Sequence, residues 1–314
     1  MEQLIKKKKL NKYGLRKEQI IFICVMLFYP VVHFLVTWLY INSETFLLSF
    51  TRYNIFAGAF QVPGNIFYNY QMWIDRFLHD ARYSGILLNS FLYFPVSCFI
   101  TLPLSVICAY FIFVKVPGGN LFRVIFFLPS ILPTVAMTMA FRFGFDTYGY
   151  INAILRKMGV ENVPIWFGSE GLTPFMIFFY CVWAGIGYNV VLLSGAMSRV
   201  PTEVVEYNKL EGVGMAREMF GVMIPMIWPT IVTLFTVGMN TVLTIYLQAY
   251  FLMGSSTSGD FGTGTIALFI FGNYSDKTQI PQLSSFGLLC SLIYVPFIFL
   301  ARWIMNKFFT EVDY

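Results

Sequence analysis

The chain has 314 residues and a net charge of +5, with 57% hydrophobic residues and only 12% charged residues. So few charges leave too little polar surface to cover a water-soluble globule of this length, and the composition favours a membrane protein instead. A bilayer core about 30 Å thick requires roughly 20 apolar residues in a helix, and several stretches without a charged residue are at least that long.

Six membrane-spanning helices are predicted in chain order, each between charged residues. Their expected ranges are 20–41, 85–113, 124–143, 173–197, 227–253 and 282–304. An even number of spans places both ends of the chain on one side of the membrane. We therefore expect an all-α membrane protein in which residues 1–19 form a basic N-terminal segment and residues 20–314 form one transmembrane domain.

Positive charge is distributed unequally between the two sets of loops. The set that contains the N-terminus holds fourteen of the 21 Lys and Arg residues, and the opposite set holds seven. Because translocation disfavours positive charge on the far side, both termini are predicted to be cytoplasmic. The basic run at residues 6–9 either marks this orientation only or also binds anionic membrane lipid.

Two segments on the predicted outer side are long enough to fold locally. Residues 53–84 are expected to form an irregular arm that ends in a short helix near residues 72–79. Residues 148–159 carry apolar side chains at helical spacing, which predicts a short helix at the membrane interface. Neither segment is expected to form a separate domain.

The segment between the fourth and fifth predicted spans, residues 198–226, combines helix signals with breaks. Thr202 is a suitable N-cap, and the acidic residues Glu203 and Glu206 follow it near the positive end of the helix dipole. Gly212 supplies a position where the chain can turn, and Pro225 leads into the next span. A second short helix would place three apolar residues on one face, namely Met215, Met219 and Val222. We therefore predict two short helices joined by a glycine turn.

The spacing in this loop resembles the signature of permeases of binding-protein-dependent ABC importers. That signature is Glu-Ala-Ala, three residues, Gly, nine residues and Ile-x-Leu-Pro, and the loop follows it in register from Glu206 through Gly212 to Pro225. Tyr207 and Asn208 stand at its two alanine positions. Further stretches are similar to the carbohydrate, or maltose-type, branch: residues 89–91 (Asn-Ser-Phe), 120–129, 148–152 (Tyr-Gly-Tyr-Ile-Asn) and 185–189 (Gly-Ile-Gly-Tyr-Asn).

The resemblance implies the six-helix fold of a maltose-type permease in the plasma membrane of a bacterium. A second, related permease would complete the path for a sugar or oligosaccharide that an extracellular binding protein delivers. Two ATPase subunits would hold ATP and Mg, so this chain itself is expected to hold no cofactor or metal and to bind no nucleic acid. The residues implied in the ATPase contact are Glu203, Glu206, Tyr207, Gly212 and Pro225. Import of a non-sugar solute by the same class of permease remains an alternative.

Polar residues recur at helical spacing along the fifth predicted span. They are Thr233, Thr236, Asn240, Thr244 and Gln248, and this spacing places them on one helical face that avoids lipid. In one interpretation Asn240, Thr244 and Gln248 line the path, with Trp183, Tyr188 and Asn189 of the fourth span as neighbours. Hydroxyl and amide groups would bind sugar hydroxyls, and aromatic rings would stack on the sugar. In the other interpretation these groups only form hydrogen bonds between helices.

Two other classes of protein fit the residues less well. An enzyme is disfavoured because the sequence has no HExxH or GxSxG motif and no cluster of His and Cys, and residues 262–265 lack the lysine of a phosphate-binding loop. An ion-coupled secondary transporter usually carries acidic residues deep in the membrane, and none lies near the middle of a predicted span. The sequence therefore favours an ATP-driven permease whose ATP is hydrolysed by another chain.

Overall fold

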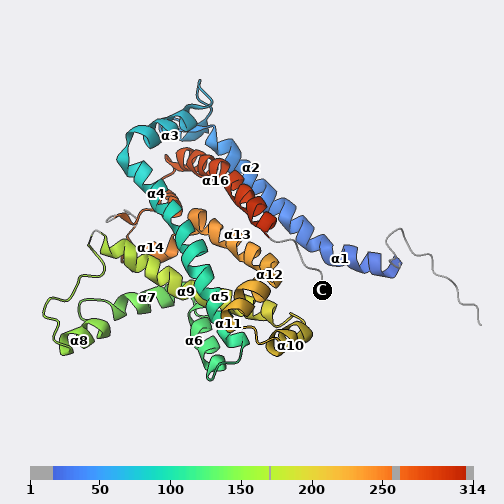
Figure 1. Ribbon diagram of the computed structural model, residues 1–314. Coiled ribbons are helices and arrows are strands. Elements are labelled where there is room, and N and C mark those ends of the chain that lie inside the picture. Colours follow the sequence, from blue (N-terminus) through green and yellow to red (C-terminus); the bar gives the residue numbers. More distant parts are fainter. Residues whose placement is uncertain (1–16, 170, 257–261, 309–314) are drawn as a thin grey trace, which may run out of the picture.

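The computed structural model describes residues 17–169, 171–256 and 262–308, and the basic run at residues 6–9 lies outside them. Helices dominate the described part of the chain, and the strands there form a single antiparallel hairpin (Figure 1). Its strands are β1 (Arg52–Asn54) and β2 (Ala59–Gln61). The hairpin therefore gives regular structure to the segment that the sequence predicts to be an irregular arm.

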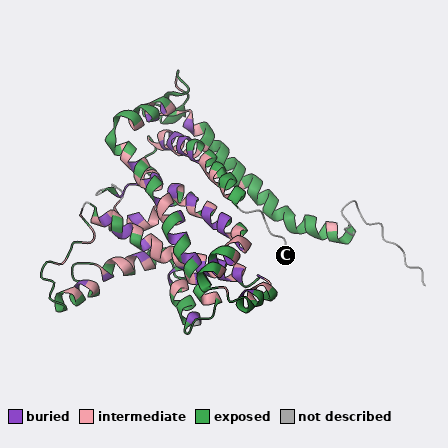
Figure 2. Ribbon diagram, in the orientation of Figure 1, coloured by how far each residue is buried: buried purple, intermediate pink, exposed green. Residues whose placement is uncertain are grey.

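The first span is a continuous helical segment of 33 residues, Lys17–Ser49. It consists of α1 (Lys17–His33), a π-helical stretch η1 (Phe34–Leu39) and α2 (Tyr40–Ser49). No residue of α1 is buried, and Figure 2 shows exposed residues along nearly all of it. Only the later part of this span packs on the body of the protein, where α2 lies against the last helix, α16 (Ile280–Phe308).

The second span is also continuous over 33 residues, Ala81–Phe113. A π-helical stretch η2 (Val96–Thr101) separates α4 (Ala81–Pro95) from α5 (Leu102–Phe113). Proline removes a backbone donor from the helical ladder, and the wider π turn directly follows Pro95. The span is thus unbroken as predicted, but its middle turn departs from α-helical geometry.

The third span is bent, which corrects the prediction of one helix over residues 124–143. It consists of α6 (Gly119–Ile131) and α7 (Thr134–Gly144), whose axes meet at 106°. Leu132 between them is extended, with ψ 148°, because the ring of Pro133 disfavours helical geometry at the residue before it.

The fifth span is broken inside its predicted range, after Thr244, so the prediction of one helix over residues 227–253 is also wrong, whereas the bend at its start falls where the predicted loop ends. A bend of 78° separates the segment that ends with α12 (Ile224–Met226) from α13 (Trp228–Thr244). Ile245 and Tyr246 then adopt non-helical geometry before the short α14 (Leu247–Leu252) begins. The single helical face predicted for Asn240, Thr244 and Gln248 is therefore interrupted by the break between α13 and α14.

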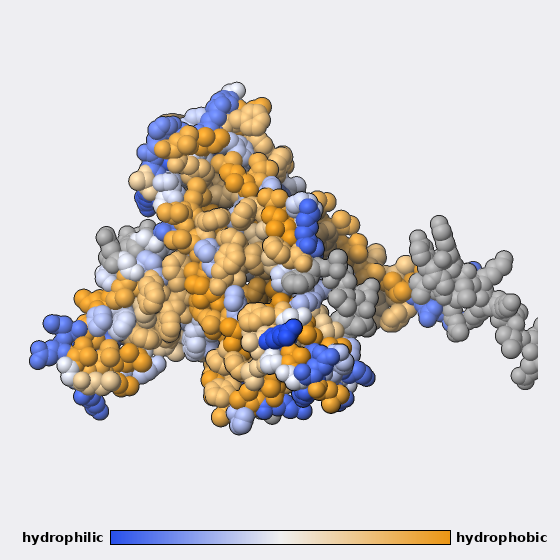
Figure 3. Space-filling view, in the orientation of Figure 1, coloured by the Kyte–Doolittle hydropathy of each residue, from blue (hydrophilic) through white to orange (hydrophobic). Residues whose placement is uncertain are grey.

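The remaining helices complete the body. The fourth span is α9 (Leu172–Met197), which packs against α5 and α6. The shorter helices are α3 (Tyr68–His79), α8 (Tyr150–Lys157) and α15 (Ile266–Asn273). By length and composition, the described helices provide four unbroken spans, or six if each bent pair crosses the membrane once. Figure 3 shows hydrophilic residues gathered near α3, near α8 and near the loop at residues 198–226, with apolar surface between them.

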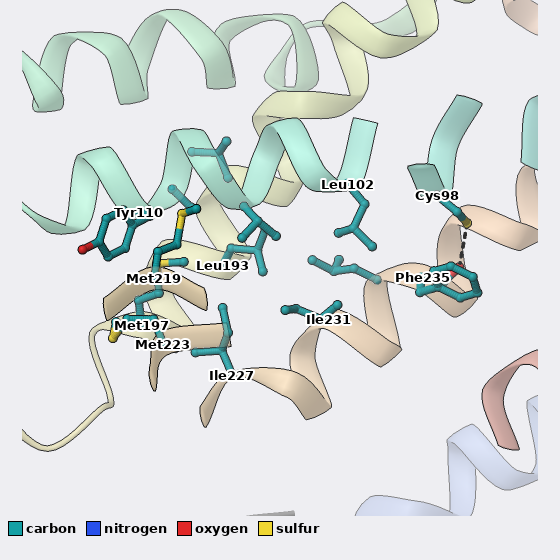
Figure 4. Close-up of a cluster of buried hydrophobic side chains, with 14 of the residues drawn as sticks. Cys98, Leu102, Tyr110, Leu193, Met197, Met219, Met223, Ile227, Ile231 and Phe235 are labelled. Atoms are coloured by element: carbon teal, nitrogen blue, oxygen red, sulfur yellow. Dashed lines mark hydrogen bonds between the residues drawn. The ribbon is translucent and has the colours of Figure 1, made fainter. Parts of the chain in front are cut away.

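The core lies where α5, α9 and α13 meet the loop at residues 198–226 (Figures 2 and 4). Close backbone contact also joins α9 to α6 at Gly187, where a Cβ atom would lie 1.9 Å from the carbonyl oxygen of Phe126. Only glycine permits that approach, because any other side chain would overlap the neighbouring helix. At the opposite end of the body from that loop, the buried Trp73 of α3 donates a hydrogen bond of 2.8 Å to the Gln282 carbonyl at the start of α16.

Candidate functional site

A cavity of about 370 Å³ lies where η2, α9 and α13 meet the bend between α6 and α7. Much of its lining is polar, and none of the described residues that line it carries a charged side chain. The lining hydroxyl and amide groups include those of Ser97, Ser130, Tyr188, Asn189, Thr241 and Gln248. A cavity with neutral hydrogen-bonding groups suits a neutral, hydroxyl-rich solute.

Three of the six residues predicted for the path line this cavity, namely Tyr188, Asn189 and Gln248. Trp183 does not: its ring stacks on Phe141, with centroids 5.9 Å apart, inside an apolar cluster. Asn240 and Thr244 also lie outside the lining and are exposed. The face of α13 that reaches the cavity instead carries Val237, Gly238 and Thr241. The reason is that residues 240 and 244 lie on a different side of the helix, and the break after Thr244 separates them from Gln248.

The threonines of the predicted polar stripe bond within their own helix rather than between helices. The hydroxyl of Thr233 donates to the Pro229 carbonyl at 2.9 Å, and that of Thr236 donates to Val232 at 2.8 Å. Thr244 makes the same type of bond to Asn240 at 3.0 Å. For these three residues, the interpretation of the stripe as a set of interhelical hydrogen bonds is therefore wrong.

Close packing brings η2 into the cavity wall. A Cβ atom on Gly238 would lie 2.8 Å from Ser97 Oγ, and one on Gly185 would lie 3.1 Å from Thr101 Cγ2. These glycines let α13 and α9 approach η2, so that Ser97 and Thr101 reach the cavity. Neither hydroxyl residue was among those predicted from the sequence to line the path. The Gly-Ile-Gly-Tyr-Asn stretch was the signal that could have found this wall.

A second groove of about 410 Å³ continues along the same two helices, α9 and α13. Leu234 lines both the groove and the cavity, and the groove further includes Gly195, Thr230 and Thr233. Arg199, just beyond the end of α9, lies at its margin. The cavity and the groove together place hollows with scattered polar groups along much of the length of α9 and α13.

The loop at residues 198–226 contains the two short helical segments that the sequence predicts. The first is α10 (Thr202–Leu210), and Gly212 follows it with a left-handed φ of 68° that favours glycine. The prediction of Thr202 as N-cap is wrong: Pro201 holds that position, and Thr202 is the first helical residue. Glu203 lies in the first turn as expected.

The exposed face of α10 combines acidic and apolar side chains. Glu203 and Glu206 are exposed, as are Tyr207 and Leu210, at 59% and 87% of their surface. The Tyr207 hydroxyl donates a hydrogen bond to the Glu211 carboxylate, and this bond raises the pKa of Tyr207 above its ordinary value.

Asn208, at the other alanine position of the signature, is buried, unlike the exposed Tyr207. It is 8% exposed, and its Nδ2 has no hydrogen-bond partner among the described residues. The larger side chain at this position is therefore accommodated inside the protein, and only Tyr207 changes the outer face of the loop.

The second half of the loop enters the core. It consists of α11 (Met215–Glu218), a π-helical turn η3 (Met219–Met223) and α12. Met219 and Met223 are buried against Leu193 and Met197 of α9 (Figure 4), whereas Met215 is 48% exposed. The predicted face of Met215, Met219 and Val222 is therefore wrong. In the wider π turn of η3, the residue that shares the buried face with Met219 is Met223, four positions later, rather than Val222, three positions later.

Apolar helices long enough to span a bilayer, two bent spans beside a polar cavity, and a helical loop on the surface together define a multi-pass membrane permease. The chain belongs to the family described as binding-protein-dependent transport system inner membrane component, whose model matches residues 101–312. That family is the membrane component of its transport systems, which is distinct from an ATPase.

Two relatives illustrate the family. The lactose transport system permease protein LacF of Rhizobium radiobacter is 28% identical over 79% of this chain and 78% of its own length. The alpha-glucoside transport system permease protein AglF of Rhizobium meliloti (strain 1021) is 23% identical over 62% of this chain and 58% of its own length.

The fold matches a solved permease. A bacterial alginate ABC transporter, crystallised in complex with an alginate pentasaccharide-bound periplasmic protein, contains a chain with a TM-score of 0.76 and 12% identity. The match covers 94% of this chain and 98% of that chain. The predicted permease fold is thereby confirmed, although the third span is bent and the fifth is broken where the sequence predicts one straight helix each.

Proposed function

We propose that this chain forms half of the translocation path of an ATP-driven importer for a sugar or oligosaccharide. The observation that carries the proposal is the uncharged cavity lined by hydroxyl and amide groups between α9 and α13. Such groups exchange hydrogen bonds with the hydroxyls of a sugar at no cost in buried charge. Relatives named for lactose and alpha-glucoside transport support the same solute class.

A second permease would complete the path. The long helix α1 buries none of its residues against the rest of the chain, and several large apolar side chains along it are exposed. This chain supplies one wall of the translocation path, formed by α9 and α13. A related chain that faces these helices would form the other wall. The neighbour's complex with a periplasmic protein supports delivery of the solute by an extracellular binding protein.

The cytoplasmic loop would bind an ATPase subunit through the exposed face of α10. Leu210 and Tyr207 are suited to a shallow apolar groove, and Glu203 and Glu206 are suited to basic groups on its rim. Gly212 would let the angle of α10 change while the helix itself stays rigid. Pro225 lies where the loop bends into α13 and would pass the movement to the cavity wall.

The transport cycle would then be one of alternating access. The binding protein releases the solute at the outer face, and closure of two ATPase subunits on ATP and Mg moves the loops of both permeases. That movement opens the path first outward and then inward. The excess of Lys and Arg in the N-terminal segment, the loop at residues 198–226 and the end of α16 supports a cytoplasmic location for both termini. All three segments would then lie on the same side of the membrane as the ATPase.

Uptake by proteoliposomes tests the proposal. They would contain this chain, its partner permease, the ATPase and the binding protein, with a panel of labelled neutral mono- to pentasaccharides outside. We expect uptake of at least one sugar that survives a protonophore and stops when ATP is withheld. Uptake that the protonophore abolishes in the presence of ATP would contradict an ATP-driven importer. ATP-dependent uptake of only a non-sugar solute would contradict the substrate class alone.

A further inference from the structure

A buried tyrosine connects the cytoplasmic loop to the second span. Tyr110 of α5 is 1% exposed, and its Oη donates a hydrogen bond of 2.8 Å to Glu218 Oε2. The same oxygen lies 3.2 Å from the backbone carbonyl of Met215. Tyr110 therefore contacts both ends of α11, the helix that follows the glycine turn of the loop.

On the side of Tyr110 the surroundings of this contact are apolar and adaptable, whereas Glu218 also lines a pocket with Lys115, Glu206 and Lys209. Around Tyr110, the loop meets the body through Met219 and Met223, which pack near Met197 of α9 (Figure 4). Methionine side chains are unbranched and flexible, so they fill space without fixing one orientation. A hydrogen bond to a carboxylate is directional and stronger than one between neutral groups. The tyrosine thus fixes the rotation of α11 relative to α5.

Movement at Tyr110 would reach the cavity through one helical segment. The second span continues from Tyr110 to Thr101 without a break, and Ser97 and Thr101 of η2 line the cavity. Tyr110 lies nine positions after Thr101, about 13 Å along the helix axis. A rotation of α11 would therefore turn the wall that carries these hydroxyls, since a short helix transmits rotation with little bending.

We propose that the Tyr110–Glu218 hydrogen bond is a positioning contact that transmits movement of the loop at residues 198–226 to the cavity wall at η2. This inference rests on the proposed importer function. Neither residue belongs to the exposed face of α10 that would bind the ATPase, so loss of the bond should leave ATPase binding in place. It should reduce the amount of sugar moved for each ATP hydrolysed.

Tyr110→Phe tests the proposal by removing the hydroxyl while keeping the ring. Tyr294→Phe is the matched control, because the buried Tyr294 also donates to a backbone carbonyl, that of Met239 at 3.0 Å, but makes no contact with the loop. In the complete complex in proteoliposomes, three quantities are measured: co-purified ATPase, binding-protein-stimulated ATP hydrolysis, and sugar transported per ATP. For Y110F we expect normal ATPase binding and about a tenfold fall in sugar per ATP, whereas Y294F should match the wild type.

Variants at Glu218 provide a second test that does not depend on the buried ring. Glu218→Gln keeps an acceptor oxygen and should restore most of the coupling that Glu218→Ala loses. The double variant Y110F with E218A should be no worse than the poorer single variant, because both remove the same bond.

Two results would overturn the inference. One is equal sugar per ATP in Y110F, E218A and the wild type. The other is a loss that only follows reduced ATPase binding, which would mean that the contact holds the loop fold rather than transmitting movement. Failure of the wild-type complex to import any sugar would instead contradict the proposed function.

Discussion

The Thr265 hydroxyl donates a hydrogen bond of 2.7 Å to the carbonyl oxygen of Ile245, and both residues are buried. The same hydroxyl accepts a bond of 3.2 Å from the backbone N–H of Leu268. One side chain thus caps α15 and satisfies the carbonyl that the break after α13 releases. The backbone carbonyl left free where the fifth span is interrupted is therefore bonded by a specific residue elsewhere in the chain.

Thr265→Val should destabilise the protein by about 1–3 kcal/mol, because it leaves a buried carbonyl and a helix N-terminus without partners. Thermal unfolding of the detergent-solubilised protein would measure the effect. Thr265→Ser keeps the hydroxyl and serves as the control. An unchanged melting temperature for T265V would mean that the hydrogen bond does not hold the break.

Gln248→Leu should reduce sugar uptake about tenfold, since it removes one hydrogen-bonding group from the cavity. Asn240→Leu is the control: Asn240 is exposed outside the cavity lining, so we expect near-normal uptake. Uptake is measured with the labelled sugar that the wild type imports. If N240L were impaired as strongly as Q248L, the path would follow the continuous stripe of the sequence instead of the cavity.

Glu206→Lys should release the ATPase or uncouple transport, because it reverses the charge at the centre of the exposed face of α10. We expect at least a tenfold loss of co-purified ATPase or of uptake. Glu161→Lys, an exposed glutamate between α8 and α9, makes the same charge change outside the loop and should have no effect. Normal assembly and uptake in E206K would exclude this residue from the ATPase contact.

Gly187→Ala should destabilise the protein by about 3 kcal/mol, because its Cβ would overlap the carbonyl of Phe126 and force α6 away from α9. Gly85→Ala is the matched control, since Gly85 also lies in a helix but its Cβ would meet nothing within 4 Å. The control should be neutral or slightly stabilising, as alanine favours helix over glycine. Unfolding in detergent compares the two variants, and equal stability would contradict the tight helix crossing.

Sequence reasoning located the loop and the spans because both depend on local signals. Long uncharged stretches identify helices that can cross a bilayer, and Gly212 identifies the turn after α10 through its left-handed backbone. The break before Pro133 also has a local signal, because a residue that precedes proline disfavours helical geometry, and Leu132 is such a residue. The roles of Glu206 and the other loop residues in ATPase binding remain predictions.

The break at Ile245 and the choice of cavity residues were not available from local signals. No proline or glycine marks Ile245, and its carbonyl finds its partner in Thr265, twenty residues further along the chain. Likewise, Thr241 rather than Asn240 reaches the cavity because α13 is rotated by its contacts with η2 at Gly238. Helical spacing defines which residues share a face, but it does not define what that face contacts.

The sequence by itself thus determined the class of protein, the number of apolar segments and the place of the surface loop, because burial in a membrane and backbone turning depend on nearby residues. Only the tertiary structure decided that the fifth span breaks at Ile245, which polar groups line the cavity, and that Tyr110 contacts Glu218 across 108 positions of chain. Those features depend on the rotation and close approach of packed helices, which distant contacts fix together.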